Sequence, residues 1–178
     1  ANTFSDQYSL EAIRLIGKSL PEAVKNGKNL KAREDVAMAN TLAGMVETFS
    51  GCISEHSLEH AMSAFHPELP HGAGLIMISK AYYTHIADHH IADERMIAMA
   101  KALGKRDATQ AMEFVHALVD LQKACAVDEL KMSDYGIKKT ELAAMVKNAR
   151  ENMGGLFGVD PMTLTDEDCL SIYQKSFK

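Results

Sequence analysis

The sequence predicts an all-α protein, a multi-helix bundle that forms a single domain over residues 1–178. Apolar residues recur at helical spacing along nearly the whole chain, and Leu10, Ile13, Ile16 and Leu20 give an early example. No segment shows a convincing strand alternation or an internal repeat. Eleven methionines suit a core of irregularly packed helices.

The first 50 residues predict three helices. The first has Ser5 or Asp6 as its N-cap, and a short second helix has Pro21 in its first turn and Gly27 at its end. The third carries apolar residues on all sides, so we expect it to be buried nearly all round. These residues are Val36, Met38, Ala39, Leu42, Ala43, Met45, Val46 and Phe49.

Further helices follow to the C-terminus. We expect a helix that carries His56 and His60 and ends before Pro67, and a second that opens at His71 or Gly72. Two more are expected over 91–103, closed by Gly104, and over 142–153, closed by Gly154. Between them lies a helix with the apolar stripe Phe114, Leu118, Leu121 and Cys125, and the last helix starts at Thr165 with Asp168 in a capping box.

Composition narrows the possible partners. The net charge is −5 without a long basic stripe, which argues against nucleic acid and anionic membranes. No apolar run reaches the roughly 18 residues of a membrane span. Cys52, Cys125 and Cys169 are odd in number and widely spaced, so we expect buried thiols and a cytoplasmic protein.

Histidines concentrate between residues 56 and 71. His56 and His60 are four apart and share a helix face. His60 on one helix and His71 at the start of the next can aim two imidazoles at one point, after a loop broken by Pro67. Imidazole is a common ligand of divalent metals, so the sequence predicts part of a metal site.

Two other patterns involve histidine. The run from His56 through Glu59 to His60 matches the HxxEH pattern of zinc metallopeptidases, in which the glutamate activates water. Outside that pattern, Glu59 either orients a neighbouring histidine or is a solvated helix residue. His85, His89 and His90 form a second group, which we interpret as exposed residues at a helix start.

A longer run is more specific. Ser54-Glu55-His56-Ser57-Leu58-Glu59-His60-Ala61-Met62, a His66-Pro67 step and Pro70-His71-Gly72 before an apolar helix resemble the iron-containing (group III) alcohol dehydrogenases. The resemblance extends over essentially all 178 residues and implies the dehydroquinate synthase-like C-terminal helical domain of that family. The histidine segment is its strongly diagnostic part.

The resemblance implies a function for this segment. His60 and His71 match two metal ligands of the family, for Fe²⁺ or Zn²⁺. His66 matches a histidine of the substrate and nicotinamide site and is a candidate catalytic and cofactor-binding residue. The spacing from His60 to His71 is shorter than in the family, which indicates a loop deletion and leaves the alignment of His66 open.

The other half of the site is expected elsewhere. The family's remaining ligands, an aspartate and a histidine one turn apart, lie upstream of this segment, and Asp6 is followed at that spacing by Leu10. The resemblance implies that the family's N-terminal domain, which binds NAD or NADP, is not part of this chain, and the sequence contains no glycine-rich phosphate loop. We expect this domain alone to be inactive.

Three functional hypotheses remain open. The first is the C-terminal part of an oxidoreductase that transfers hydride between an alcohol or aldehyde and NAD(P), with the missing domain and a second copy of the chain as partners. The second is the HxxEH metallopeptidase. The third is a non-catalytic helical interaction domain.

Overall fold

The computed structural model describes residues 2–178, and every regular element in that range is helical. The expectation of an all-α fold is therefore confirmed. Contacts divide the described chain into two compact units. The first comprises the residues up to Gly51 together with Ala92–Ala126, and the second comprises Cys52–Ile91 and Val127–Lys178. A single domain over residues 1–178 therefore stays a prediction.

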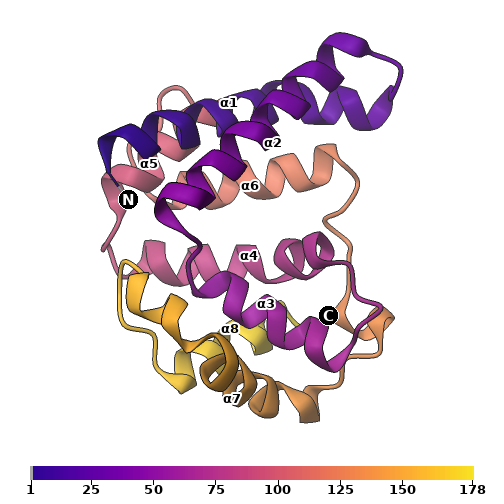
Figure 1. Ribbon diagram of the computed structural model, residues 1–178, viewed down its shortest axis with the longest axis vertical. Coiled ribbons are helices and arrows are strands. Elements are labelled where there is room, and N and C mark those ends of the chain that lie inside the picture. Colours follow the sequence, from indigo (N-terminus) through magenta and orange to yellow (C-terminus); the bar gives the residue numbers. More distant parts are fainter. Residues whose placement is uncertain (1) are drawn as a thin grey trace. The chain divides into compact units, whose positions relative to one another are not determined.

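The first unit is built on a pair of long helices that lie side by side (Figure 1). Its elements are α1 (Thr3–Lys25), α2 (Leu30–Ser50), α5 (Asp93–Ala102) and α6 (Met112–Ala124). Asp35 joins α2 to α1, because its buried carboxylate accepts a hydrogen bond from Ser19 Oγ at 2.7 Å. The ammonium groups of Lys31 and Lys18 lie 2.9 and 3.0 Å from that carboxylate. Hydrogen bonds from Lys31, Ser19 and Lys18 hold the pKa of Asp35 well below its usual range.

The predicted start of α1 and the predicted break at Pro21 were both wrong. Asn2 is the N-cap, and it exchanges hydrogen bonds with Ser5 in a capping box. Pro21 lies inside α1, which continues to Lys25. A proline within a helix removes one backbone donor and crowds the carbonyl group of the preceding turn, but α1 continues through Pro21 while it packs along α2.

The prediction that the helix around residues 36–49 is buried on all sides was also wrong. Met38, Met45 and Phe49 are 55%, 39% and 53% exposed. Only Ala32, Asp35 and Ala39 of α2 are buried. The face that carries these three residues packs on α1 within the unit, whereas Met38 and Met45 stay exposed and Phe49 contacts the edge of α1, through the ring of Phe4 at a centroid distance of 5.6 Å.

The second unit contains four longer helices and three short 3₁₀ turns. They are α3 (Ser54–Phe65), α4 (His71–Asp88), α7 (Leu142–Met153), α8 (Asp166–Ser176), η1 (Met132–Tyr135), η2 (Lys139–Glu141) and η3 (Gly154–Val159). Helices α3 and α8 each pack against both α4 and α7. Leu58, Met62, Ile78, Met145 and Ile172 are fully buried, and this core fixes the faces of α3 and α4 that remain exposed.

Several predicted helix ends are confirmed. Helix α3 ends at Phe65 before Pro67, and α4 opens at His71. Thr165 caps α8 in a capping box with Asp168. Cys125 and Cys169 are buried free thiols as expected, whereas Cys52 is half-buried. Among the described helices, none combines the length and the hydropathy that a membrane span requires.

The second histidine group differs from its prediction. His85 and His89 lie at the end of α4 rather than at a helix start, and His85 is buried. The His85 Nε2 atom lies 3.8 Å from Asp168 Oδ1 and has no hydrogen-bond partner among the described residues. Burial lowers the pKa of His85, with the Asp168 carboxylate acting in the opposite direction.

This environment predicts an acid-sensitive fold. The unfolded chain binds a proton at His85 more readily than the folded chain, so the free energy of unfolding decreases as the pH falls below the ordinary histidine pKa of about 6.5. We expect His85→Gln, which cannot take up a proton, to reduce this dependence by up to about 1 kcal/mol per pH unit. Urea unfolding at several pH values between 5 and 8 measures the pH dependence of the free energy of unfolding. The same pH dependence in His85→Gln and wild type would contradict the role given to His85.

Candidate metal centre

The candidate centre lies on two neighbouring helices of the second unit. His56 and His60 project from α3 one turn apart, and His71 is the first residue of α4. Pro70 precedes it in an extended conformation, so the chain enters α4 directly at His71. The packing of α3 on α4 therefore brings histidines from two segments to one place.

The three imidazoles form a compact cluster. Their ring centroids are 6.3 Å apart for His56 and His60, and 5.2 Å apart from each of these to His71. One ring nitrogen of each residue lies within 4.8 Å of those of the other two. Nitrogens that share one metal ion at a usual bond length are separated by at most roughly 4.2 Å, so small rotations of the rings would complete the geometry.

Glu59 lies beneath the cluster and holds His71. Its side chain has no solvent exposure, and its Oε2 atom accepts a hydrogen bond from His71 Nδ1. Ser63 Oγ donates to the other oxygen, Oε1, at 2.6 Å. A carboxylate that binds one ring nitrogen of histidine fixes the ring and its tautomer, which leaves the other nitrogen free for a ligand. The interpretation of Glu59 as a solvated helix residue was therefore wrong.

A close approach between the two helices makes this contact possible. A Cβ atom at Gly74 of α4 would lie 2.7 Å from both Cγ and Oε1 of Glu59. Such a distance is shorter than real Cβ contacts allow, so the carboxylate of Glu59 can occupy its position only because residue 74 has no side chain.

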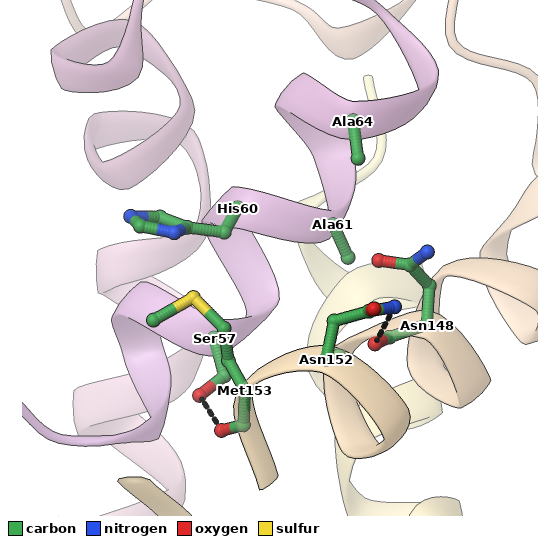
Figure 2. A pocket seen from close by; sticks show the side chains of 8 residues that line it. Ser57, His60, Ala61, Ala64, Asn148, Asn152 and Met153 are labelled. Carbon is green, nitrogen blue, oxygen red and sulfur yellow. Dashed lines mark hydrogen bonds between the residues drawn. The ribbon is translucent and has the colours of Figure 1, made fainter.

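A groove of about 320 Å³ lies between α3 and α7 beside the cluster. Figure 2 shows that the ring of His60 points away from the amide side chains of Asn148 and Asn152. Within the groove, Ser57 Oγ donates to the backbone oxygen of Met153 at 2.8 Å, and Asn152 Nδ2 donates to the backbone oxygen of Asn148 at 3.1 Å. The groove therefore borders the backbone of His60 rather than the point at which the imidazoles meet.

His66 has a different environment. It is the C-cap residue of α3, and its Nε2 atom lies 3.2 Å from Glu141 Oε2. Hydrogen bonding by the backbone N–H of Lys138 is the main cause that lowers the pKa of Glu141, and His66 adds to it. A Cβ atom at Gly136 would lie 3.6 Å from the His66 ring. These contacts do not test the predicted catalytic role of His66, which stays a prediction.

The structure adds His56 to the pair His60 and His71 that the family resemblance singled out. Its i, i+4 spacing from His60 placed it in the predicted histidine cluster, but the sequence analysis named it as a metal ligand only in the peptidase pattern. The sequence offered Glu59 as a residue that orients a neighbouring histidine, and its hydrogen bond with His71 agrees with that alternative. The close approach of α3 to α4 at Gly74, on which this contact depends, had no signal in the sequence.

The second unit is thus all-helical and brings together three histidines that could bind a metal ion. The sequence matches the model of the Fe-containing alcohol dehydrogenase family, C-terminal, over residues 1–177. The chain therefore belongs to the Fe-containing alcohol dehydrogenase family, as the C-terminal domain.

Known relatives agree with this assignment. The chain is 28% identical to the 1,3-propanediol dehydrogenase of Citrobacter freundii over 184 residues, which are 99% of this chain and 46% of the relative. It is 31% identical to a long-chain primary alcohol dehydrogenase of Thermoanaerobacter ethanolicus, covering 99% of this chain and 45% of the relative. The chain thus spans less than half of the length of these relatives.

Solved structures share the fold. An alcohol dehydrogenase from an archaeal halo-thermophile of the Red Sea brine pool superposes with a TM-score of 0.90 at 29% identity, over 99% of this chain and 45% of that chain. An alcohol dehydrogenase from Oenococcus oeni gives 0.85 at 24% identity, over 99% and 46% of the two chains, and this likeness shows the fold alone.

The contact at Gly74 gives a prediction about the orientation of His71. We expect Gly74→Ala to displace the Glu59 carboxylate from His71 and to weaken Zn²⁺ binding about tenfold, the usual effect of losing a partner that orients a ligand. Isothermal titration calorimetry of the protein measures this change.

Gly72→Ala is the matched control. It lies on the same helix two residues away, and a Cβ atom there meets nothing within 4 Å. Zn²⁺ affinity should remain within about threefold of wild type in this variant. An equal loss of Zn²⁺ affinity in Gly74→Ala and Gly72→Ala would contradict the claim that the close approach at Gly74 positions Glu59 against His71.

Proposed function

We propose that the protein is the metal-binding half of an alcohol dehydrogenase that transfers hydride between an alcohol or aldehyde and NAD or NADP. The observation that carries this proposal is the convergence of His56, His60 and His71 in a chain of the Fe-containing alcohol dehydrogenase family. The substrate class is also the one named for its relatives, which are alcohol dehydrogenases.

The residues present fit a divalent metal. Three imidazoles with their nitrogens close together suit Fe²⁺ or Zn²⁺, and both ions accept nitrogen ligands. His60 and His71 are the proposed ligands of this half, and His56 joins them in the same cluster. A metal bound here supplies Lewis-acid polarisation of the alcohol or aldehyde oxygen.

The chain's own residues would prepare this site. His71 donates through Nδ1 to Glu59, so its Nε2 is the nitrogen available to the ion. His60 and His71 are exposed and His56 is half-buried, which leaves one side of the cluster open to further ligands and to substrate. The remaining ligands and the dinucleotide site belong, in this proposal, to an N-terminal domain.

Two finer roles complete the proposal. His66 is proposed to line the substrate and nicotinamide site and to move a proton, with Glu141 as its hydrogen-bond partner.

The exposed apolar face of α2, with Met38, Met45 and Phe49, is proposed to dock the N-terminal domain or a second copy of the chain. A cytoplasmic location remains part of the proposal.

The competing hypotheses have less support. A metallopeptidase of the HxxEH type needs Glu59 to activate water, but both oxygens of Glu59 are engaged by His71 and Ser63 and the side chain is fully buried. A purely structural helical module gives no reason for three histidines of two helices to meet at one point. Family membership also favours the dehydrogenase.

The test uses the complete enzyme, in which this chain is joined to its cofactor-binding half. We expect His60→Ala and His71→Ala to lower bound metal below half of the wild-type content and to reduce alcohol-dependent NAD(P) reduction by at least about two orders of magnitude. Metal analysis and steady-state rates on the same samples measure both.

Exposed His116 on α6 provides the matched control, because His116→Ala removes an imidazole from another helix. It should retain wild-type metal content and activity. Wild-type activity in both His60→Ala and His71→Ala would contradict the proposal. Peptide hydrolysis that Glu59→Gln abolishes would support the metallopeptidase instead.

A further inference from the structure

We propose that Asp160 is a positioning residue, whose side chain ties the start of α3 to α4 and so sets the relative position of the histidines that these helices carry. The inference rests on the proposed function, because the position of the histidines matters for chemistry only if they bind a metal. Asp160 itself belongs to the loop after η3, far from the histidines in sequence.

Helix α3 begins without a capping side chain of its own. Its N-cap residue is Ile53, which has no side-chain acceptor, although the first backbone N–H groups of a helix require partners. The N–H of Ser54 donates instead to Asp160 Oδ1 at 2.9 Å, across 106 residues of sequence. A distant carboxylate therefore takes the place of the local cap.

The same oxygen also binds α4. The hydroxyl of Tyr82 donates to Asp160 Oδ1 at 3.0 Å, and Ser54 Oγ lies 3.1 Å from that hydroxyl. Ser54 and Tyr82 are both completely buried. Burial raises the pKa of the Tyr82 phenol, so it remains a proton donor at neutral pH. One oxygen atom thus connects the backbone of α3 to a side chain of α4.

The connected helices are those of the histidine cluster. Ser54 is two residues before His56, and Tyr82 is on the helix that opens with His71. A shift in the first turn of α3 moves His56 directly, because both residues lie in the same turn. Asp160 thereby acts on the cluster through the backbone and without contacting an imidazole.

The acceptor oxygen of Asp160, rather than its negative charge, should hold the two helices together. Asp160 Oδ2 is shielded from solvent and has no hydrogen-bond partner among the described residues, and the links to Ser54 and Tyr82 both run through Oδ1. An asparagine at position 160 keeps one acceptor oxygen for both links, and its NH2 group takes the place of Oδ2, which makes no hydrogen bond to the described residues. An alanine removes both links.

The experiment is a Co²⁺ titration of the protein followed by its visible absorption spectrum. We expect Asp160→Ala to weaken Co²⁺ binding about tenfold or more and to alter the spectrum, in line with the usual loss of an outer partner of a metal site. Asp160→Asn should restore both properties to within about threefold of wild type.

Asp168→Ala is the matched control. Asp168 accepts hydrogen bonds from Thr165 at the start of α8, so this variant also removes a helix cap, but from a helix without any of the three histidines. Its other neighbour, His85, lies in the last turn of α4, at the opposite end of that helix from His71. It should lower the melting temperature to a similar extent as Asp160→Ala and keep the Co²⁺ affinity and spectrum of wild type. Unchanged Co²⁺ affinity in Asp160→Ala would overturn the inference, and so would an equal loss of Co²⁺ affinity in Asp168→Ala.

Amide hydrogen exchange of the metal-free protein separates this inference from the proposed function. Asp160→Ala should accelerate exchange at the first amides of α3 about tenfold, and Asp168→Ala should not. Absence of any Co²⁺ binding by wild type would contradict the metal proposal, while slow exchange at α3 in Asp160→Ala would overturn the role of Asp160 independently.

Discussion

The hydrogen bond between Glu59 and His71 is the constraint on which the arrangement of the candidate centre depends. It places a fully buried carboxylate between two helices, where burial is unfavourable unless hydrogen bonds compensate for lost hydration. His71 and Ser63 supply those hydrogen bonds, and Gly74 supplies the space. The hydrogen bond from His71 compensates for the lost hydration of the Glu59 carboxylate, and it also fixes the orientation of the His71 ring. One interaction therefore contributes both to the stability of the α3–α4 interface and to the geometry of the candidate centre.

The second unit places its polar groups around this contact in two separate networks. Glu59, Ser63 and His71 hold the centre of the α3–α4 interface, whereas Ser54, Tyr82 and Asp160 hold the start of α3. Both networks are supported by the apolar core that includes Leu58 and Met62 on the buried side of α3. The exposed side of the same helix is then free to present His56 and His60.

Local signals in the sequence predicted much of the fold. Helix ends marked by Pro67, His71 and Thr165 were correct, because proline geometry and capping act within a few residues. Pro21 misled the prediction, since α1 packs along α2 and continues through it. The burial of α2 was overestimated because composition does not reveal how many neighbours a helix has.

Part of the candidate site was also predictable, because the spacing of residues within a helix is visible in the sequence. The histidine spacing and the family resemblance indicated His60 and His71, and the i, i+4 pair contained His56. The contribution of Asp160 joins positions 106 residues apart, and that of Gly74 depends on an interhelical distance. Such contacts have no periodicity in one sequence, so only the tertiary structure reveals them.

The central claim is that histidines from α3 and α4 share one metal ion, and X-ray absorption spectroscopy of the Zn²⁺-loaded protein tests it most directly. The account predicts two or three imidazole ligands with nitrogen at about 2.0–2.1 Å from zinc. It also predicts that the imidazole scattering decreases in His71→Ala. A first shell of oxygen alone, unchanged in that variant, would contradict a centre built from these histidines.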